Sequence, residues 1–216
     1  MARREKYIPA LGHDWLTPLY DPLLRWVMRE ETFKRRLIAQ ADIQPGQRVL
    51  DLGCGTATLT ILIKQVHPDS EVVGVDADVK VLDIGRAKAS KAGVDITLDH
   101  GMAFQLPYPD RSFDRVLSSL VLHHLTTENK RRTLSEVFRV LRPGGELHVV
   151  DFGKPHKAWG RLVAPLIHRL ERAADNVTGR LPAIFREAGF DQVEEMGWHV
   201  TAFGSLSFYR ARKSAE

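Results

Sequence analysis

The segment Val49-Leu50-Asp51-Leu52-Gly53-Cys54-Gly55-Thr56-Ala57-Thr58-Leu59 decides the fold of this 216-residue chain. Its apolar first half, which begins at Arg48, is too short for a buried helix and is typical of a central parallel strand. The two glycines then permit a sharp turn in which the backbone lies against a ligand, where any Cβ would collide. The two threonines are expected to cap the helix from Leu59 to Val66, whose free N–H groups favour an anionic or polar ligand.

A second strand is predicted from Glu71 to Asp76, after a break at Pro68-Asp69. Asp76 ends this strand, and in a βαβ unit the carboxyl ends of neighbouring parallel strands meet at one edge of the sheet. We therefore expect the Asp76 carboxylate to lie near the glycine turn and to accept hydrogen bonds from both hydroxyls of a ribose. The alternatives are a solvated carboxylate at the strand end and the cap of the next helix.

Further helices and strands alternate along the rest of the chain. A helix is expected at 30–41, with Phe33, Leu37 and Ile38 on its apolar side and Lys34, Arg35 and Arg36 on its solvated side. Other helices are expected at 79–91, 128–141 and 182–188. Strands are expected at 95–99, 114–118 and 146–151, with a turn at 142–145. The strict alternation up to residue 151 predicts a parallel, doubly wound α/β sheet.

The glycine turn differs from two common nucleotide-binding motifs. A dinucleotide fingerprint needs glycine or alanine where this chain has Thr58, and no Gly-Lys-Ser/Thr string of a P-loop occurs. Asp-Leu-Gly-Cys-Gly-Thr-Ala instead resembles the cofactor-binding motif of class I S-adenosylmethionine (SAM) dependent methyltransferases, although Ala57 stands where many members have a third glycine. The resemblance implies that Asp51 holds the amino acid end of SAM, the cofactor that becomes S-adenosylhomocysteine.

Later segments resemble the same family in the same order. Residues 101–114 are similar to its adenine-contacting segment, with Met102 in place of the usual acid, and Leu-Arg-Pro-Gly-Gly-Glu-Leu is another landmark. The string Leu-Pro-Tyr-Pro-Asp-Arg-Ser-Phe-Asp and a late Ala-Gly-Phe are most similar to the ubiquinone/menaquinone biosynthesis methyltransferases. The resemblance implies a Rossmann-like seven-stranded sheet, mostly parallel with the last strand antiparallel, and with helices on both faces. Its closing hairpin would be formed by 191–196 and 205–212, joined by a loop that contains Trp198, His199 and Phe203.

The predicted cofactor-binding residues lie in the glycine turn and just beyond the strand ends. They are Asp51, Gly53, Cys54, Gly55, Thr56, Asp76, Ala77, Met102, Ala103 and Ser119.

Candidates on the acceptor side are Tyr20, His123, His124 and Asp151, together with His13, and none is singled out as a general base. SAM already carries an activated methyl group, so that positioning the acceptor and excluding water can suffice. The adjacent histidines suggest a metal site, but zinc needs three or four ligands and no further ligand pattern accompanies them. No metal is therefore predicted.

The chain is expected to contain a helical segment at 1–43 that covers the active site, and a SAM-binding domain at 44–212. Within that domain a helix at about 156–176 lies where related enzymes place a lid over the acceptor. An ordinary packed surface helix is the alternative there.

Composition limits the partners. The net charge is +4 with no concentrated basic tract, so no nucleic acid is expected, and a peripheral membrane contact is left open. No run of about eighteen apolar residues occurs, the basic N-terminus lacks an apolar signal region, and Cys54 is the single cysteine. These features predict a cytoplasmic protein.

The predicted function is methyl transfer from SAM to a small, apolar or quinone-like acceptor. Phospholipids and other small molecules remain alternatives, as does a non-catalytic SAM-binding protein. Thr58 disfavours a nicotinamide dehydrogenase, and the absence of an Asn-Pro-Pro-Tyr string after the fourth strand disfavours methylation of nucleic-acid amines. The oligomeric state is not determined by the sequence.

Overall fold

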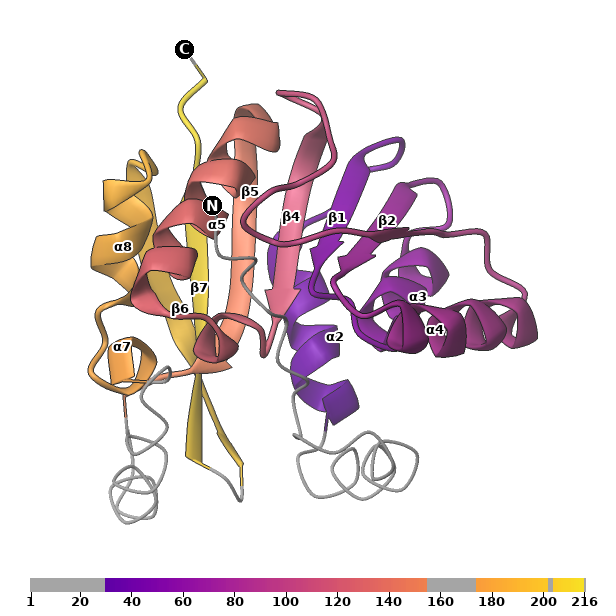
Figure 1. The fold of residues 1–216 in the computed structure, drawn as a ribbon, viewed down its shortest axis with the longest axis horizontal. Coiled ribbons are helices and arrows are strands. Elements are labelled where there is room, and N and C mark those ends of the chain that lie inside the picture. The colour runs from indigo at the N-terminus through magenta and orange to yellow at the C-terminus, as the bar shows by residue number, and fades with distance from the viewer. Residues whose placement is uncertain (1–29, 155–173, 202–203, 216) are drawn as a thin grey trace, which may run out of the picture.

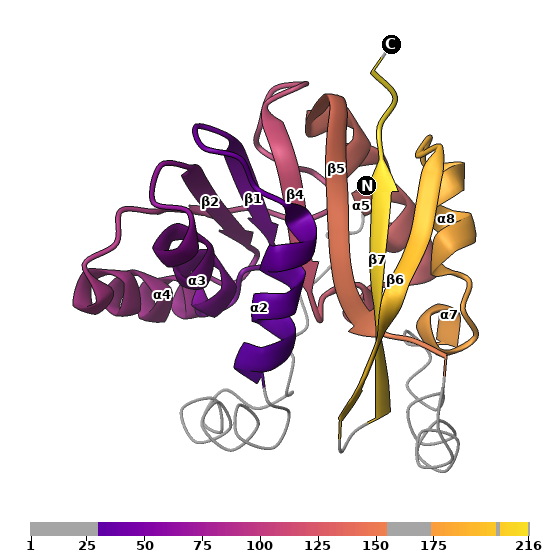
Figure 2. The same cartoon turned by 180° about the vertical axis from the view of Figure 1, so that it is seen from behind.

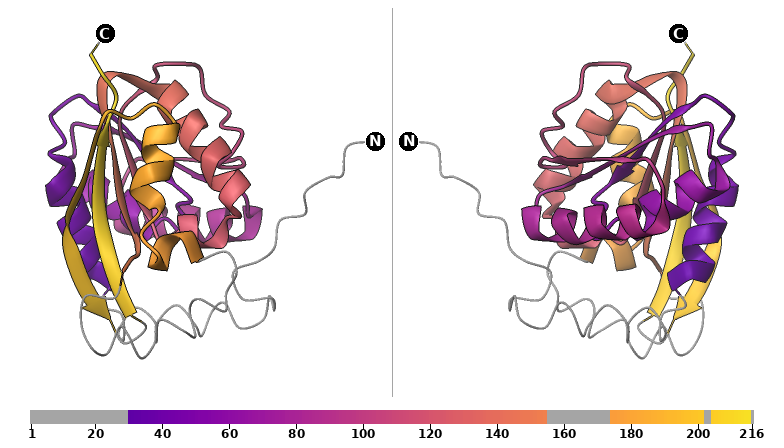
Figure 3. Two further views of the ribbon diagram at one scale, coloured as in Figure 1. Left: turned by 90° about the vertical axis from the view of Figure 1, so that its left-hand side faces the viewer. Right: turned by 90° about the vertical axis from the view of Figure 1, so that its right-hand side faces the viewer.

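The computed structural model describes residues 30–154, 174–201 and 204–215, which form a seven-stranded sheet with helices on both faces (Figures 1 and 3). The strands are β1 (Arg48–Leu52), β2 (Glu71–Asp76), β3 (Thr97–His100), β4 (Phe113–Ser119), β5 (Leu141–Phe152), β6 (Gln192–Thr201) and β7 (Gly204–Arg212). The helices are α2 (Glu30–Ala41), α3 (Thr58–Val66), α4 (Val79–Ala92), the short 3₁₀ helix η1 (Leu122–His124), α5 (Thr127–Val140), α7 (Ala174–Val177) and α8 (Leu181–Glu187).

The strand order is β3-β2-β1-β4-β5-β7-β6. The first five strands are parallel to one another, and β7 lies antiparallel between β5 and β6. The predicted doubly wound sheet with an antiparallel last strand is therefore confirmed. Because the crossover from β3 to β4 reverses the direction in which strands are added, β1 and β4 meet at the switch point where such sheets bind ligands.

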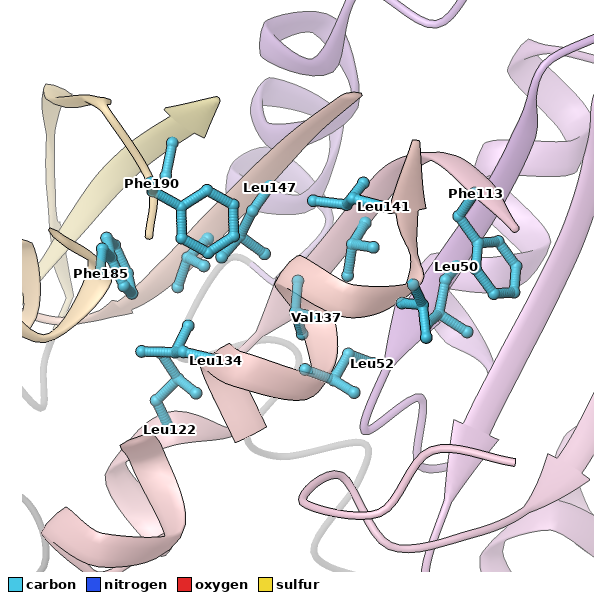
Figure 4. Close-up of a cluster of buried hydrophobic side chains, with 14 of the residues drawn as sticks. Leu50, Leu52, Phe113, Leu122, Leu134, Val137, Leu141, Leu147, Phe185 and Phe190 are labelled. Carbon is cyan, nitrogen blue, oxygen red and sulfur yellow. The ribbon is translucent and has the colours of Figure 1, made fainter. Parts of the chain in front are cut away.

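Two apolar layers separate the sheet from its helices. On one face α2, α3 and α4 cover the strands (Figure 2), and Phe33, Leu37 and Ile38 of α2 are buried there as the sequence predicts. On the other face α5 and α8 pack through Leu134, Val137 and Phe185 against the strands, as Figure 4 shows. Central strands covered on both sides explain the nearly continuous apolar runs in β1 and β2.

Three local predictions are wrong. Lys34, expected on the solvated side of α2, is buried and paired with Glu30 one turn earlier. β5 begins at Leu141, which already pairs with Phe113, so that the expected turn at 142–145 is a bulge within the strand. Trp198 and His199 belong to β6, not to a loop; Phe203 lies outside the described residues.

The apparent loop around Trp198 is a bulged strand. The pairing of β6 with β7 shifts register between Glu195 and Gly197, and Gly197 has a φ of 130°. The Arg36 guanidinium of α2 lies where a Cβ on Gly197 would point, and it donates to the carbonyl groups of Met196 and Trp198. The glycine therefore marks the site where α2 contacts the backbone of the edge strand.

His148 of β5 is a fully buried polar residue at the contact with α2. Its Nδ1 lies 3.2 Å from Nε2 of Gln40, and its Nε2 lies 3.2 Å from Oε2 of Glu146. A neutral ring satisfies both contacts, since Gln40 donates to Nδ1 and the ring N–H donates to Glu146. Burial lowers the pKa of His148 despite the neighbouring Glu146, and Arg115 and Arg210 add to this effect.

The buried His148 predicts acid-sensitive stability. The unfolded chain takes up a proton below about pH 6.5, whereas the folded chain holds His148 neutral to a lower pH, so stability falls as the pH drops through this window. The loss is about 1.4 kcal/mol for each pH unit that separates the two pKa values. We expect His148→Gln to be less stable than the wild type at pH 7.5, and this gap to shrink by pH 5. Urea unfolding across this range measures it, and His100→Gln controls for removal of an exposed imidazole.

Candidate functional site

The turn after β1 is held against the end of β2. The N–H groups of Gly53 and Cys54 both donate to the carbonyl oxygen of Val75, at 2.8 and 3.0 Å. Gly53 has a φ of 70°, and a Cβ there would lie 2.5 Å from Cγ2 of Val121. Gly55 has a φ of 52°, and no atom lies within 4 Å of where its Cβ would be. Glycine is thus needed at Gly53 for packing of the neighbouring loop, while Gly55 faces open space.

The prediction that Thr56 and Thr58 cap α3 is wrong. The residue at the cap position is Ala57, in a left-handed conformation with φ 60°, and it makes no side-chain capping bond. The two threonine hydroxyls instead lie 2.9 and 2.7 Å from Nζ of Lys88 on α4. Lys88 therefore fastens the glycine turn to α4, a contact between distant segments that no local pattern signals.

Asp76 lies at the end of β2, beside the glycine turn as predicted. Its Oδ2 accepts from the N–H of Gly55 at 2.9 Å, and its Oδ1 accepts from the N–H of Asp78 at 3.0 Å. Burial raises the pKa of Asp76, although these N–H groups oppose the shift. The next helix is capped by Asp78, whose side chain accepts from the N–H of Lys80, so Asp76 is not the cap.

Asp51 of β1 lies deeper in the fold. It is 1% exposed, and its Oδ2 accepts a 2.7 Å hydrogen bond from the hydroxyl of Thr60 on α3. Burial raises the pKa of Asp51 to about 6, against the opposing effect of the Thr60 hydrogen bond. The carboxylate thus sits under the glycine turn, and Thr60 is a partner that the sequence reasoning missed.

Cys54 is buried between the turn and β2. A Cβ on Gly74 would lie 2.9 Å from the Cys54 sulfur, so the thiol fills the space over that glycine. Burial, with Asp51 and Asp76 nearby, raises the pKa of the Cys54 thiol far above its ordinary value. A thiol kept protonated in this way is not a nucleophile.

The segment after β3 returns to the same edge. The N–H of Gly101 donates to the carbonyl of Asp76 at 2.9 Å, and Met102 forms an isolated bridge with Gln105. Met102 and Ala103 are half-buried, and a His100 ring nitrogen lies 3.2 Å from the carbonyl oxygen of Ala77. The segment predicted to contact adenine therefore starts beside Asp76.

Ser119 ends β4 opposite the turn. Its hydroxyl is buried and has no hydrogen-bond partner among the described residues. The next residue, Leu120, has a φ of 60°, a strained value for a branched side chain. A buried orphan hydroxyl and local backbone strain at a strand end are features that cluster at functional sites.

His123 and Asp151 form a hydrogen-bonded pair at the ends of η1 and β5. Nδ1 of His123 lies 2.8 Å from Oδ1 of Asp151, which is fully buried. The other carboxylate oxygen accepts from the N–H groups of Leu122 and His123, and Phe152 N–H donates to Oδ1. Burial would raise the pKa of Asp151, but His123 and these donors outweigh it and lower the pKa.

An ionised Asp151 fixes the state of the imidazole. Since the carboxylate can only accept, Nδ1 of His123 carries the proton of this contact, and Asp151 does not engage Nε2. The ring lies against that of His124, with a centroid separation of 3.9 Å and an angle of 42° between the ring planes, and it meets the Phe152 ring edge to face at 4.9 Å. A carboxylate that orients an imidazole in this way is the arrangement that prepares histidine as a general base.

The structure therefore brings three of the acceptor-side candidates together. Tyr20 and His13 lie outside the described residues, as do the expected covering segment before residue 30 and most of the expected helix at 156–176. Within the described ranges, no group of three or more histidine, cysteine, aspartate or glutamate side chains is placed to hold a metal ion. No helix in that part of the chain is long and apolar enough to cross a bilayer.

Comparison with known proteins agrees with this geometry. Residues 49–145, from β1 into β5, match the model of a methyltransferase domain family. A demethylmenaquinone methyltransferase of Symbiobacterium thermophilum is 30% identical over 244 aligned positions, covering 99% of this chain and 95% of its own. An uncharacterised methyltransferase of Synechocystis is 35% identical over 186 positions, covering 85% and 84%.

The fold has relatives among solved structures. Phosphoethanolamine N-methyltransferase 2 of Haemonchus contortus, in complex with SAM, superposes with a TM-score of 0.68 at 18% identity, covering 85% of this chain and 52% of that protein. At this identity the likeness concerns the fold alone. The match along nearly the whole length of a methyltransferase from Symbiobacterium thermophilum shows the family: the chain belongs to the SAM-dependent methyltransferases.

Proposed function

We propose that this enzyme transfers the methyl group of SAM to a ring carbon or hydroxyl of a small hydroquinone-like acceptor, with His123 as the general base. The observation that carries the proposal is the His123–Asp151 pair at the carboxyl edge of the sheet. The name of the Symbiobacterium thermophilum relative, a demethylmenaquinone methyltransferase, supports the class of acceptor.

The residues at this edge fit SAM. Gly55 faces open space, and the buried hydroxyl of Ser119 lacks a protein partner among the described residues. A carboxylate offers about four acceptor positions, so Asp76 can bind two ribose hydroxyls besides the N–H groups of Gly55 and Asp78. Asp51 supplies a negative charge for the amino acid end. When bound, SAM supplies an electrophilic methyl group on a sulfonium sulfur.

The acceptor must be electron-rich to attack such a methyl group. A hydroquinone ring satisfies this requirement when a ring hydroxyl loses its proton, whereas the oxidised quinone is itself an electrophile. Nε2 of His123 can take that proton, since Nδ1 is bonded to Asp151. The new bond joins the acceptor to the methyl carbon, and the electron pair of the broken bond stays on sulfur.

The first prediction concerns the redox state of the acceptor. With a short-chain demethylmenaquinone as the probe, we expect methylation of the dithionite-reduced form and none of the oxidised form. Mass detection of the methylated ring under anaerobic conditions measures this. Equal turnover of both forms, or methylation of phosphoethanolamine or phosphatidylethanolamine in their place, would contradict the proposed acceptor.

The second prediction concerns His123. We expect His123→Gln to lower kcat by roughly 10²–10⁴-fold, the usual contribution of a general base, and to leave the Kd of SAM unchanged. His124→Gln is the matched control, because its ring lies against His123 but is not the one held by Oδ1 of Asp151. If the two variants lose activity equally, or His123→Gln loses none, His123 is not the base.

The third prediction concerns Asp76. We expect Asp76→Ala to raise the Kd of SAM at least about tenfold, since each hydrogen bond to a charged group contributes about 1.5–3 kcal/mol. Titration calorimetry measures this. Asp83→Ala removes the same charge from an exposed ion pair with Arg86 on α4 and should leave the Kd unchanged. A folded Asp76→Ala protein with the wild-type Kd would remove Asp76 from the site.

A further inference from the structure

One face of α5 fastens the segment that joins β3 to β4. Arg132, Glu136 and Arg139 share this face, because helix positions four and three residues apart lie above one another. None of the three takes part in the chemistry described above. Their partners lie at 104–110, roughly thirty positions earlier in the chain.

The Arg139 guanidinium binds the backbone of this segment at two points. Its Nη1 lies 2.8 Å from the carbonyl oxygen of Tyr108 and 2.8 Å from Oδ1 of Asp110, and its Nη2 lies 3.2 Å from the carbonyl oxygen of Leu106. Nε and Nη2 also donate to the two carboxylate oxygens of Glu136, at 2.8 and 2.9 Å. A planar guanidinium with five donors can make this set of bonds, whereas a lysine cannot.

Glu136 and Arg132 add two further attachments. Oε2 of Glu136 accepts from the N–H of Leu106 at 2.8 Å, so both backbone groups of Leu106 are bound to α5. Arg139 lowers the pKa of Glu136 below its ordinary value, the Leu106 N–H adds to this effect, and burial opposes it. The Arg132 guanidinium lies over the Phe104 ring, 4.7 Å from the ring centroid. The helix therefore holds the segment on both sides of a single residue.

The held positions belong to, and directly follow, a short turn at the carboxyl edge of the sheet. Met102 forms a bridge with Gln105, whose N–H donates to the Met102 carbonyl group at 3.0 Å. Within this turn, the N–H groups of Ala103 and Phe104 donate to no other group of the described residues. The turn thus offers two backbone donors to a ligand, and their positions depend on how the turn is held.

This turn lies where the base of SAM is expected. β1, β2 and β3 are consecutive neighbours in the sheet, and the ribose of SAM lies between its amino acid end and its adenine. With the amino acid end at Asp51 on β1 and the ribose at Asp76 on β2, the adenine reaches the end of β3. There the N–H of Gly101 is bonded to the carbonyl group of Asp76 at 2.9 Å. The Met102 thioether is only a weak acceptor, so the N–H groups of the turn are its stronger polar contacts for a base.

We propose that Arg139, together with Glu136 and Arg132, is a positioning residue for the adenine of SAM: this face of α5 fixes the turn in which the base is recognised. A backbone N–H can donate to N1 of adenine, whereas hypoxanthine carries a hydrogen on N1. Such recognition needs donors held in place before binding, since ordering a loose loop lowers affinity. The inference rests on the SAM site of the proposed function, and not on the acceptor or the base.

The test measures base selectivity as well as affinity. By titration calorimetry we expect the wild type to bind S-adenosylhomocysteine at least about tenfold more tightly than S-inosylhomocysteine, its deaminated analogue. In Arg139→Gln we expect the Kd of S-adenosylhomocysteine to rise about five- to tenfold, and the preference to fall to about threefold or less.

A second pair of variants changes the exposed end of the same face. Arg132→Leu should shift the Kd and the preference in the same direction by a smaller factor, because only the contact with Phe104 is changed on the segment. Arg132→Lys keeps a cation over that ring and should retain the wild-type preference. Since Arg132 is exposed, this pair decides the outcome if Arg139→Gln does not fold.

The matched control is Arg131→Met. Arg131 is the neighbour of Arg132 but pairs with Glu187 of α8, so this variant should retain both the Kd and the preference. Amide hydrogen exchange of residues 101–110 in the free protein separates positioning from stability. If exchange becomes faster in Arg139→Gln while the preference stays at the wild-type value, the contacts only stabilise the fold and the proposal fails.

Two further results would overturn the proposal: a wild type without preference for the adenine compound, or an equal loss of preference in Arg131→Met. The experiment contains no acceptor, so a failure of methyl transfer to a reduced quinone leaves its result standing. If Asp76→Ala weakens S-adenosylhomocysteine while Arg139→Gln and Arg132→Leu keep the wild-type preference, the SAM site stands and only the positioning role fails.

Discussion

The hydrogen bonds to the carbonyl oxygen of Val75 are the contact on which the carboxyl edge of the sheet depends. Two consecutive N–H groups, from Gly53 and Cys54, donate to it and bind the end of β1 to the end of β2. Once this contact is made, the N–H of Gly55 reaches the Asp76 carboxylate, and the loop at Val121 packs over Gly53. Strand ends from three parts of the sheet are thereby fixed at the switch point by a few backbone bonds.

Three carboxylates at this edge have different environments and so different chemistry. Asp51 is buried with one hydroxyl partner, and its pKa is raised to about 6. Asp76 accepts from the N–H of Gly55 in the glycine turn and from the N–H of Asp78, and burial raises its pKa. Asp151 is the most enclosed, yet His123 and three N–H groups keep its pKa low. Burial alone would have raised the pKa of all three, so it is the donors that separate their roles.

The sequence predicts the central strands and their alternation with helices because the signals are local. Each central strand is a short apolar run ended by turn residues, and Asp76 ends its strand at the expected place. Side chains that are far apart in the sequence but in contact in the fold leave no such signal. The bond from Lys88 to the threonines of the glycine turn and the ion pair of Lys130 with Asp175 depend on how α4 and α7 pack. The loop expected to contain Trp198 and His199 is part of β6, where Gly197 forms a bulge opposite Arg36.

The position of β7 has a consequence for how the chain folds during its synthesis. The last strand in the sequence lies inside the sheet, between β5 and β6, so its place stays vacant until residues 204–212 have been synthesised. Until then β5 presents an unpaired apolar edge, of the kind that recruits other chains. Strands β1 to β4 are synthesised earlier, but the part of the sheet around β5, which carries Asp151, is completed only when residues 204–212 have been synthesised. Nascent chains are therefore most exposed to misassembly along the edge of β5.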